Sequence, residues 1–276
     1  MKEPFGPHRR RISGNFQLSR FDLQRKPPCV QPSFISPSWA LPASVFLPAC
    51  PSSPGLQSTN PTYNKNIIQE LELATTVADR FTILKAQGLS DAYFKYNFNL
   101  AVNPTPGGGT GKGRSGVLAN RKNFPALIGL GVSASVGFLN PCGMNTPHTH
   151  PRASEFLTIA SGANVKTGFI QEKGINTELT TTLDQYEGAI FPMGSIHYEF
   201  NDSCEPAVFI AAFESDDPGF RRIAQNFFGL GQDVVDPDLG YPKFLDHTNI
   251  AEFEASIPPV FALGTKSCLD RCGIKY

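Results

Sequence analysis

The short stretch around His148 and His150 constrains this chain more than any other part of its sequence. The two histidines are separated by one residue, so in a β-strand both imidazole rings point to the same face. Pro151 follows at once, and because proline cannot donate to a strand ladder, it favours a break in the strand. Glu155 then stands before an apolar run and is expected to begin the next strand. The stretch therefore predicts two strands that bring two imidazoles and one carboxylate together.

A third histidine, His197, lies just beyond a Pro-x-Gly turn at residues 192–194. Three neutral imidazoles and one carboxylate suit manganese or iron, with nickel, copper and zinc as alternatives. An octahedral ion held by four protein atoms would keep two positions open for water or a substrate. We therefore expect a metal centre whose ligands are His148, His150, Glu155 and His197. His247 stands apart from these residues and is interpreted as a surface or capping residue.

The spacing of these residues forms two motifs. The first reads H-x-H-x4-E-x6-G from His148 to Gly162, and the second reads P-x-G-x2-H-x3-N from Pro192 to Asn201. Both motifs resemble those of the cupin superfamily, and the spelling of residues 147–155 is similar to the germin-like branch. The flanking stretches 139–146 and 211–219 look most like spherulin-type members. The resemblance covers roughly residues 60–276.

The resemblance implies an all-β fold, the double-stranded β-helix of a jelly-roll barrel. The chain's own pattern agrees, because short apolar segments separated by turns are typical of such barrels. These segments are residues 132–139, 156–159, 163–170, 178–183 and 204–213. A chain with 25 Gly, 24 Pro and 17% charged residues also fits a turn-rich β protein better than a helical bundle.

Four segments are expected along the chain. Residues 1–60 are rich in proline and show no helical or strand period, which predicts a disordered tail. Residues 61–93 carry one helix, since apolar residues follow a 3.6-residue period from Ile67 to Leu84 before Gly88. Residues 94–232 form the cupin domain, and residues 233–276 form a C-terminal extension with a short helix at 249–256.

A strand followed by a loop is expected near the start of the cupin domain. Residues 92–102 alternate apolar and polar side chains, which predicts a strand. The glycine-rich residues 104–116 differ from a phosphate-binding loop, because Lys112 is followed by Gly113 rather than by Ser or Thr. We expect them to form a flexible surface loop.

The net charge is zero, which argues against nucleic acid as a partner. The basic residues 9–11 suggest a sorting or nucleic-acid patch, but a solvated basic tail is the simpler interpretation. No apolar run approaches the ~20 residues that span a membrane, so no membrane partner is expected.

The sequence shows no clear signal peptide, although the resemblance implies an extracellular protein. The resemblance also implies a homo-oligomer, with residues 66–84 and 250–257 as candidate contacts.

Four of the six cysteines are candidates for disulfides: Cys142, Cys204, Cys268 and Cys272. Cys142 precedes the first motif and Cys204 follows the second, so one option is a bond between them. Cys268 and Cys272 are close enough in sequence to bridge around one turn. Six cysteines allow 15 connectivities, and free buried thiols are the alternative. Disulfides would indicate an oxidising compartment. Asn201 opens an Asn-x-Ser sequence, and we favour a structural role for it over glycosylation.

The resemblance implies manganese-dependent oxalate oxidation or superoxide dismutation, so oxalate and superoxide are candidate small anionic substrates. Asn145 matches an asparagine that lies beside the substrate in oxalate-oxidising germins. A second asparagine of those proteins is replaced here by Ser135, which weakens the case for oxalate oxidation. The alternative is a non-enzymatic spherulin-like structural, storage or encystment protein whose metal stabilises the barrel. A sugar-binding or isomerase cupin is a third option, because one fold hosts many functions. Whether the chain is an enzyme is left open.

Overall fold

The computed structural model describes residues 60, 63–88, 93–102, 107–172, 177–242 and 250–276. These residues lie within one compact unit, residues 57–276. Residues 1–59 of the expected disordered tail and His247 fall outside the described residues.

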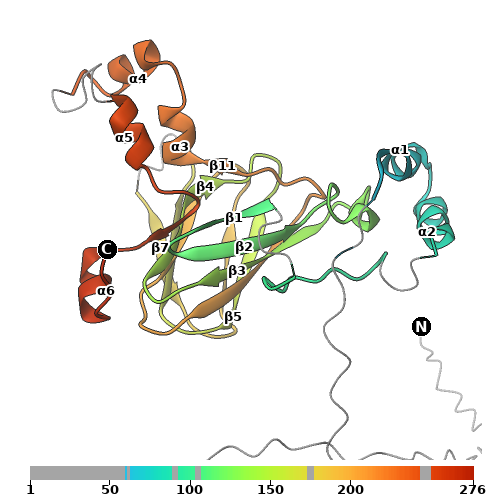
Figure 1. Cartoon of the computed structure of the whole chain (residues 1–276), viewed down its shortest axis with the longest axis horizontal. Coiled ribbons are helices and arrows are strands. Elements are labelled where there is room, and N and C mark those ends of the chain that lie inside the picture. Colours follow the sequence, from blue (N-terminus) through green and yellow to red (C-terminus); the bar gives the residue numbers. More distant parts are fainter. Residues whose placement is uncertain (1–59, 61–62, 89–92, 103–106, 173–176, 243–249) are drawn as a thin grey trace, which may run out of the picture. The chain divides into compact units, whose positions relative to one another are not determined.

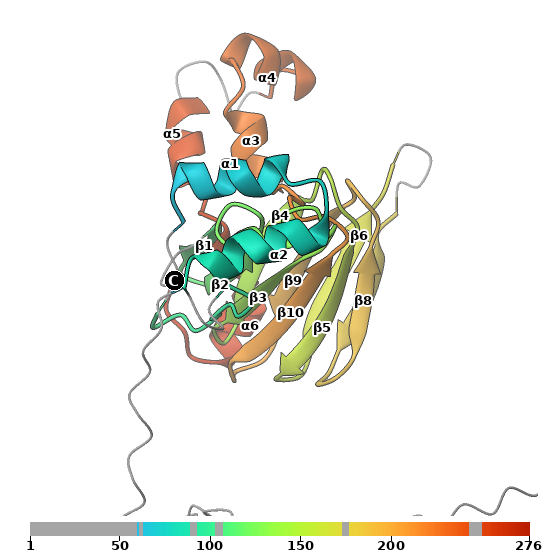
Figure 2. The same ribbon diagram turned by 90° about the vertical axis from the view of Figure 1, so that its right-hand side faces the viewer.

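Two antiparallel sheets make up the described β-structure. The first has the strand order β1-β2-β3-β10-β5-β8 (Figure 2). The second has the order β11-β4-β9-β6-β7, with β12 paired to β4. The first sheet comprises β1 (Gly107–Gly111), β2 (Arg114–Ala119), β3 (Ser133–Leu139), β10 (Ala207–Phe213), β5 (Glu155–Ser161) and β8 (Gly188–Phe191). The second comprises β11 (Arg221–Arg222), β4 (Gly143–Thr149), β9 (Ile196–Asn201), β6 (Val165–Ile170), β7 (Leu179–Leu183) and β12 (Phe261–Leu263). The expected all-β jelly-roll fold is confirmed.

Alternating side chains from both sheets fill the space between them. On β10, Phe209, Ala211 and Phe213 are buried while Ile210 is exposed. On β5, Leu157 and Ile159 are fully buried. Burial of each large apolar side chain stabilises the fold by about 1.5–3 kcal/mol. The same alternation turns the polar residues of the motifs inward, because their strands follow the same two-residue period.

The expected helix over residues 61–93 is two helices, α1 (Lys65–Leu73) and α2 (Val77–Ala86) (Figure 1). The single-helix prediction was wrong because Ala74 adopts an extended conformation and Thr76 starts a new helix. The Thr76 hydroxyl accepts a hydrogen bond from the Asp79 N–H at 3.1 Å, as N-cap residues do. The 3.6-residue period of apolar residues therefore continues across the break between α1 and α2. Leu71 and Leu84 pack together with Ala126 near the 3-10 turn η1 (Pro125–Leu127).

Two expectations near the start of the barrel were also wrong. Residues 93–102 are extended or turn-like and contain no strand. Their backbone is held by side chains instead, as when the Asn97 N–H donates to Asn60 Oδ1 at 2.8 Å. Most of the stretch expected to be a flexible loop belongs to the β1–β2 hairpin, which spans residues 107–119. The glycines of this hairpin allow the backbone of another strand to approach closely, as described below.

The chain after β11 holds four short helices in the described residues. α3 (Ile223–Phe228), α4 (Gln232–Asp238) and α5 (Ile250–Ser256) gather at one end of the barrel, as Figure 1 shows. The rings of Phe228 and Phe253 meet there at 5.0 Å. The short helix expected near residues 249–256 is α5. The fourth helix, α6 (Lys266–Arg271), follows β12 and was not predicted. Within the part of the chain that the structure describes, none of the helices is both long and apolar enough to cross a bilayer.

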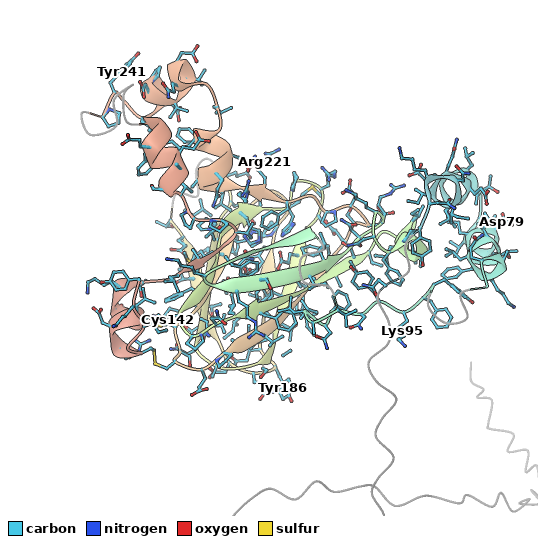
Figure 3. The ribbon with its side chains drawn as sticks, in the orientation of Figure 1. Asp79, Lys95, Cys142, Tyr186, Arg221 and Tyr241 are labelled. Atoms are coloured by element: carbon cyan, nitrogen blue, oxygen red, sulfur yellow. A yellow bond between two sulfur atoms is a disulfide. The ribbon has the colours of Figure 1, made fainter. Side chains whose placement is uncertain are left out.

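The four candidate cysteines form two disulfides among the described residues, Cys142–Cys268 and Cys204–Cys272. Their Cα atoms are 5.7 Å and 5.3 Å apart, and Cys142 lies beside α6 in Figure 3. The pairings considered from the sequence were therefore wrong. Cys268 and Cys272 are one helical turn apart on α6, so both can face the barrel. Cys142 does lie next to the turn that carries Cys204, since its N–H donates to Ser203 O. Asn201 is buried and its Nδ2 donates to Asn140 O and Glu205 O, a structural role.

Candidate metal centre

Three strands bring the motif residues together. His148 lies on β4 and is directly paired with His197 on β9. An irregularity in the register between Asn145 and His148 accommodates Pro147, because proline is tolerated in strands at bulges. His150 follows the end of β4, and β5 begins at Glu155 after the turn that Pro151 opens. The site therefore joins both sheets of the barrel.

Four side-chain atoms converge at one point, and all belong to buried residues. The ligand atoms of His148, His150, Glu155 and His197 lie within 4.8 Å of one another. The Nε2 atoms of His150 and His197 are each 3.1 Å from Glu155 Oε2. Around an ion bound at about 2.1 Å, neighbouring ligand atoms at right angles lie about 3.0 Å apart. The arrangement fits one metal ion.

The second nitrogen of each imidazole also supports metal binding. Nδ1 of His148 lies 2.8 Å from Thr146 O, and Nδ1 of His197 lies 2.9 Å from Ser195 O. Nδ1 of His150 lies 2.6 Å from Gly219 O. A carbonyl only accepts hydrogen bonds, so each Nδ1 carries the proton and donates it. Each Nε2 is then the nitrogen left to face the other candidate ligands, and it would give its lone pair to a bound ion, as in metal-binding histidines.

The charges of the cluster suit a cation. Burial lowers the pKa of His148 well below its usual value, and the neighbouring His197 and His150 lower it further. His148 is therefore neutral, as a metal ligand must be. Burial alone would raise the pKa of Glu155, but hydrogen bonds from His150 and His197 hold it well below its usual range. Burial would lower the pKa of His197, and its contact with Glu155 raises it instead.

Aromatic rings enclose the cluster. Phe191 stacks on His197 with ring centroids 4.3 Å apart, and Phe220 stacks on His148 at 4.7 Å. Beside the ligands lies a cavity of about 30 Å³. Since about 10–15 Å³ suffices for one water molecule, it has room for roughly two or three. Its apolar lining comes from Leu118, Phe209, Ala211, Phe213, Phe220 and Phe261, and none of its described lining residues is Lys or Arg.

Asn145 lines this cavity, as the sequence suggested, but its partner was missed. Asn145 Nδ2 donates to Glu199 Oε2 at 2.8 Å. Glu199 is fully buried on β9, two residues after His197 and so on the same inward face. That two-residue spacing is the signal that could have identified it. Burial, together with the charge of Glu155, raises the pKa of Glu199 to about 8.

The polar groups that face the cavity are mainly hydrogen-bond acceptors. One of the two N–H groups of Asn145 Nδ2 donates to Glu199, and the buried Oδ1 of Asn145 has no hydrogen-bond partner within the described residues. Ser135 also lines the cavity, and its hydroxyl donates to Val117 O at 3.2 Å. A ligand would therefore meet the metal, acceptor oxygens and apolar rings, but few donors.

Comparison with known proteins agrees with this geometry. Residues 101–237 match the family model described as Cupin. Spherulin-1A of Physarum polycephalum is 38% identical over 207 residues, which are 75% of this chain and 79% of that protein. The chain belongs to the cupin family of spherulins and germin-like proteins. Germin-like protein 8-9 of Oryza sativa subsp. japonica is also similar to this cupin, with 35% identity over 59% of this chain and 75% of its own.

Solved structures agree on the fold of this cupin. An oxalate oxidase structure superimposes with a TM-score of 0.52 and covers 62% of this chain and 86% of its own. The structure of an oxalate oxidase in complex with the substrate analogue glycolate also superimposes with a TM-score of 0.52. The sequence identity to both is 22%. These neighbours support the cupin barrel as a fold.

Proposed function

We propose that this cupin binds a manganese ion through His148, His150, Glu155 and His197 and acts as a superoxide dismutase. One observation carries the proposal: three imidazoles, each with its Nδ1 bonded to a backbone carbonyl, turn Nε2 to one point that they share with a buried carboxylate. This donor set suits manganese or iron better than calcium or magnesium, which prefer oxygen ligands. A bound manganese ion would supply open coordination positions and one-electron redox chemistry.

The size of the cavity supports superoxide over larger substrates. Dismutation combines two superoxide anions with two protons and gives dioxygen and hydrogen peroxide. Superoxide, dioxygen and hydrogen peroxide each contain only two oxygen atoms, so they suit a cavity with room for roughly two or three water molecules. The aromatic rings around the ligands keep the cavity small and exclude bulk water, which strengthens the electrostatic interactions inside it.

Oxalate oxidation is the second candidate, because Asn145 lines the cavity as expected for that activity. Two solved neighbours with this fold are named oxalate oxidase, but at 22% identity they support the fold alone. A bound oxalate would need donors for its second carboxylate. Few are available, because the Ser135 hydroxyl already donates to Val117 O and one of the two N–H groups of Asn145 Nδ2 donates to Glu199.

A non-enzymatic spherulin-like role is the third candidate, and it is favoured by the 38% identity to Spherulin-1A. In that case the metal would stabilise the barrel by linking β4, β5 and β9, because it binds the folded state alone. We also propose a secreted location, since the two disulfides persist best in an oxidising compartment. We further propose that the protein assembles as a homo-oligomer, as its resemblance to germin-like cupins implies.

The test is to strip the purified protein with a chelator and reload it separately with manganese, iron and zinc. Zinc has no redox chemistry, so the zinc-loaded protein is the matched control for a folded but inactive site. We expect superoxide removal by the manganese form only, with no hydrogen peroxide formed from oxalate. Oxalate turnover would favour the second candidate. A loaded manganese protein with neither activity, but with raised thermal stability, would favour the third.

A further inference from the structure

The metal cavity has a wall that does not come from the cupin domain itself. Phe261 lies on β12 in the C-terminal extension, beyond residues 101–237 that match the family. β12 pairs with the outer edge of β4, where Phe261 is opposite Asn145. Next to this pair, the Thr146 N–H donates to Val260 O at 2.8 Å. The strand is therefore attached directly to the ligand-bearing strand.

The other side of β12 faces the β1–β2 hairpin. The Gly113 N–H donates to Phe261 O at 3.3 Å. A Cβ atom at Gly111 would lie 1.7 Å from Phe261 O, and one at Gly113 would lie 2.2 Å from Ala262 O. Only glycine allows so close an approach of two backbones at these positions. The glycine-rich hairpin is thus shaped to receive β12, which fills the seam between β4 and the first sheet.

The Phe261 side chain fills the interior. It is only 2% exposed, belongs to the barrel core and lines the cavity together with His148 and Asn145. Because packed interiors leave little free volume, the ring sets how much room remains beside the metal ligands. Removal of the ring would enlarge the cavity toward the C-terminal extension.

A three-residue strand is a weak element by itself, and α6 anchors it. The Gly264 N–H, directly after β12, donates to Cys142 O at 2.7 Å. From α6, Cys268 bonds to Cys142, which directly precedes β4, and Cys272 bonds to Cys204, which follows β9. Leu269 and Leu263 pack in the same cluster. Each disulfide thus ties α6 to a strand that carries a metal ligand.

We infer that β12 and α6 form a disulfide-anchored wall of the metal cavity, and that Phe261 sets the size of ligand that the cavity accepts. The inference deepens the proposed function, because it assigns the specificity of the same site to small ligands. Its geometry does not depend on a bound metal, so it can be tested in the protein without one.

The first arm of the test replaces Phe261 by Ala. An engineered apolar cavity stays dry and binds benzene or xenon, so we expect the Phe261→Ala protein to bind benzene, detected by NMR and by a higher melting temperature. Leu263→Ala is the matched control, since Leu263 lies on the same strand but packs against α6. The wild type and Leu263→Ala should not bind benzene. If Phe261→Ala does not fold, Phe261→Val serves with xenon as the probe.

The second arm removes the anchor with the Cys268→Ser/Cys272→Ser double variant, or with a phosphine reductant on the folded wild type. We expect amide hydrogen exchange at Thr146 and Gly113, which donate to β12, to accelerate at least tenfold. Exchange at Leu157 on β5, away from the seam, should not change. Unchanged exchange at Thr146 and Gly113, or no benzene binding by a folded Phe261 variant, would overturn the inference. A wild type that holds no metal would overturn the proposed function and leave both arms decisive.

Discussion

At the scale of single residues, the site holds two buried acidic side chains, Glu155 and Glu199, which are hydrogen-bonded to different partners. Glu155 stays charged because it accepts from His150 and His197. Glu199 accepts from Asn145, and its other oxygen, Oε1, has no hydrogen-bond partner among the described residues. Removing the donor from a buried carboxyl group lowers the stability of the fold, because no water is present to replace the lost hydrogen bond. Asn145 is therefore expected to matter for stability as well as for the cavity.

We predict that Asn145→Ala lowers the free energy of unfolding by about 1–3 kcal/mol, the usual cost of an unsatisfied buried polar group. Urea unfolding with a chelator present would measure this without the metal. At a pH above about 8, where Glu199 becomes charged, the additional replacement Glu199→Gln should recover part of the loss, since it removes the buried charge. Ser135→Ala is the control, because Ser135 also lines the cavity but bonds only to Val117 O. Equal losses in Asn145→Ala and Ser135→Ala would show that the Asn145–Glu199 bond has no special role.

At the scale of elements, α6 is fixed to the barrel by charges as well as by disulfides. Arg271 donates to the Asp202 backbone oxygen at 2.9 Å and also to its carboxylate, and Lys166 of β6 bonds to the same carboxylate. Asp202 is only 9% exposed. Burial alone would raise its pKa, but the hydrogen bonds from Lys166 and Arg271 lower it. The network therefore links α6, β6 and the end of β9.

The lowered pKa of Asp202 predicts a pH dependence with a definite sign. A carboxyl group whose folded pKa lies below its unfolded value stabilises the fold above that unfolded value, about 3.9 for Asp. The contribution is lost as the pH falls below about 4. We expect Asp202→Asn to lower the melting temperature at pH 6 and to leave it nearly unchanged at pH 3. Asp270→Asn removes an exposed pair with Lys266 on the same helix and should have little effect at either pH. A loss of equal size at both pH values in Asp202→Asn would contradict this account.

At the scale of the whole molecule, the barrel and its C-terminal anchor should hold the metal without the first part of the chain. Residues 27–58 contain no charged residue and many prolines, so the sequence offers no periodic face that could pack. We predict that deletion of residues 1–58 leaves metal content and melting temperature nearly unchanged. Calorimetry and metal analysis of the shortened protein would check this. A clear loss of folding would show that these residues dock on the barrel.

The sequence predicted most strands, and it pointed to the four residues that the structure brings together, because most of these signals are local. His148, His150 and Glu155 lie within eight residues, and the strand period is visible in each apolar segment. The features that it did not predict depend on which distant segments meet. β12 has only three residues, too few to show a period, and its role follows from contacts with β4 and the glycine hairpin. The disulfide pairs likewise follow from the position of α6.

The most direct test of the central claim is the metal content of three purified proteins: the wild type, His197→Ala and His247→Ala. His197 reaches the site from β9 while His148 and His150 come with β4, so its loss removes one ligand and one of the links between strands. We predict about one equivalent of metal in the wild type and in His247→Ala. His197→Ala should lose most of it, since second-shell changes alone cost 10- to 100-fold in affinity and a lost ligand costs at least as much. A full equivalent in His197→Ala, together with loss of metal in His247→Ala, would contradict the assignment of the site.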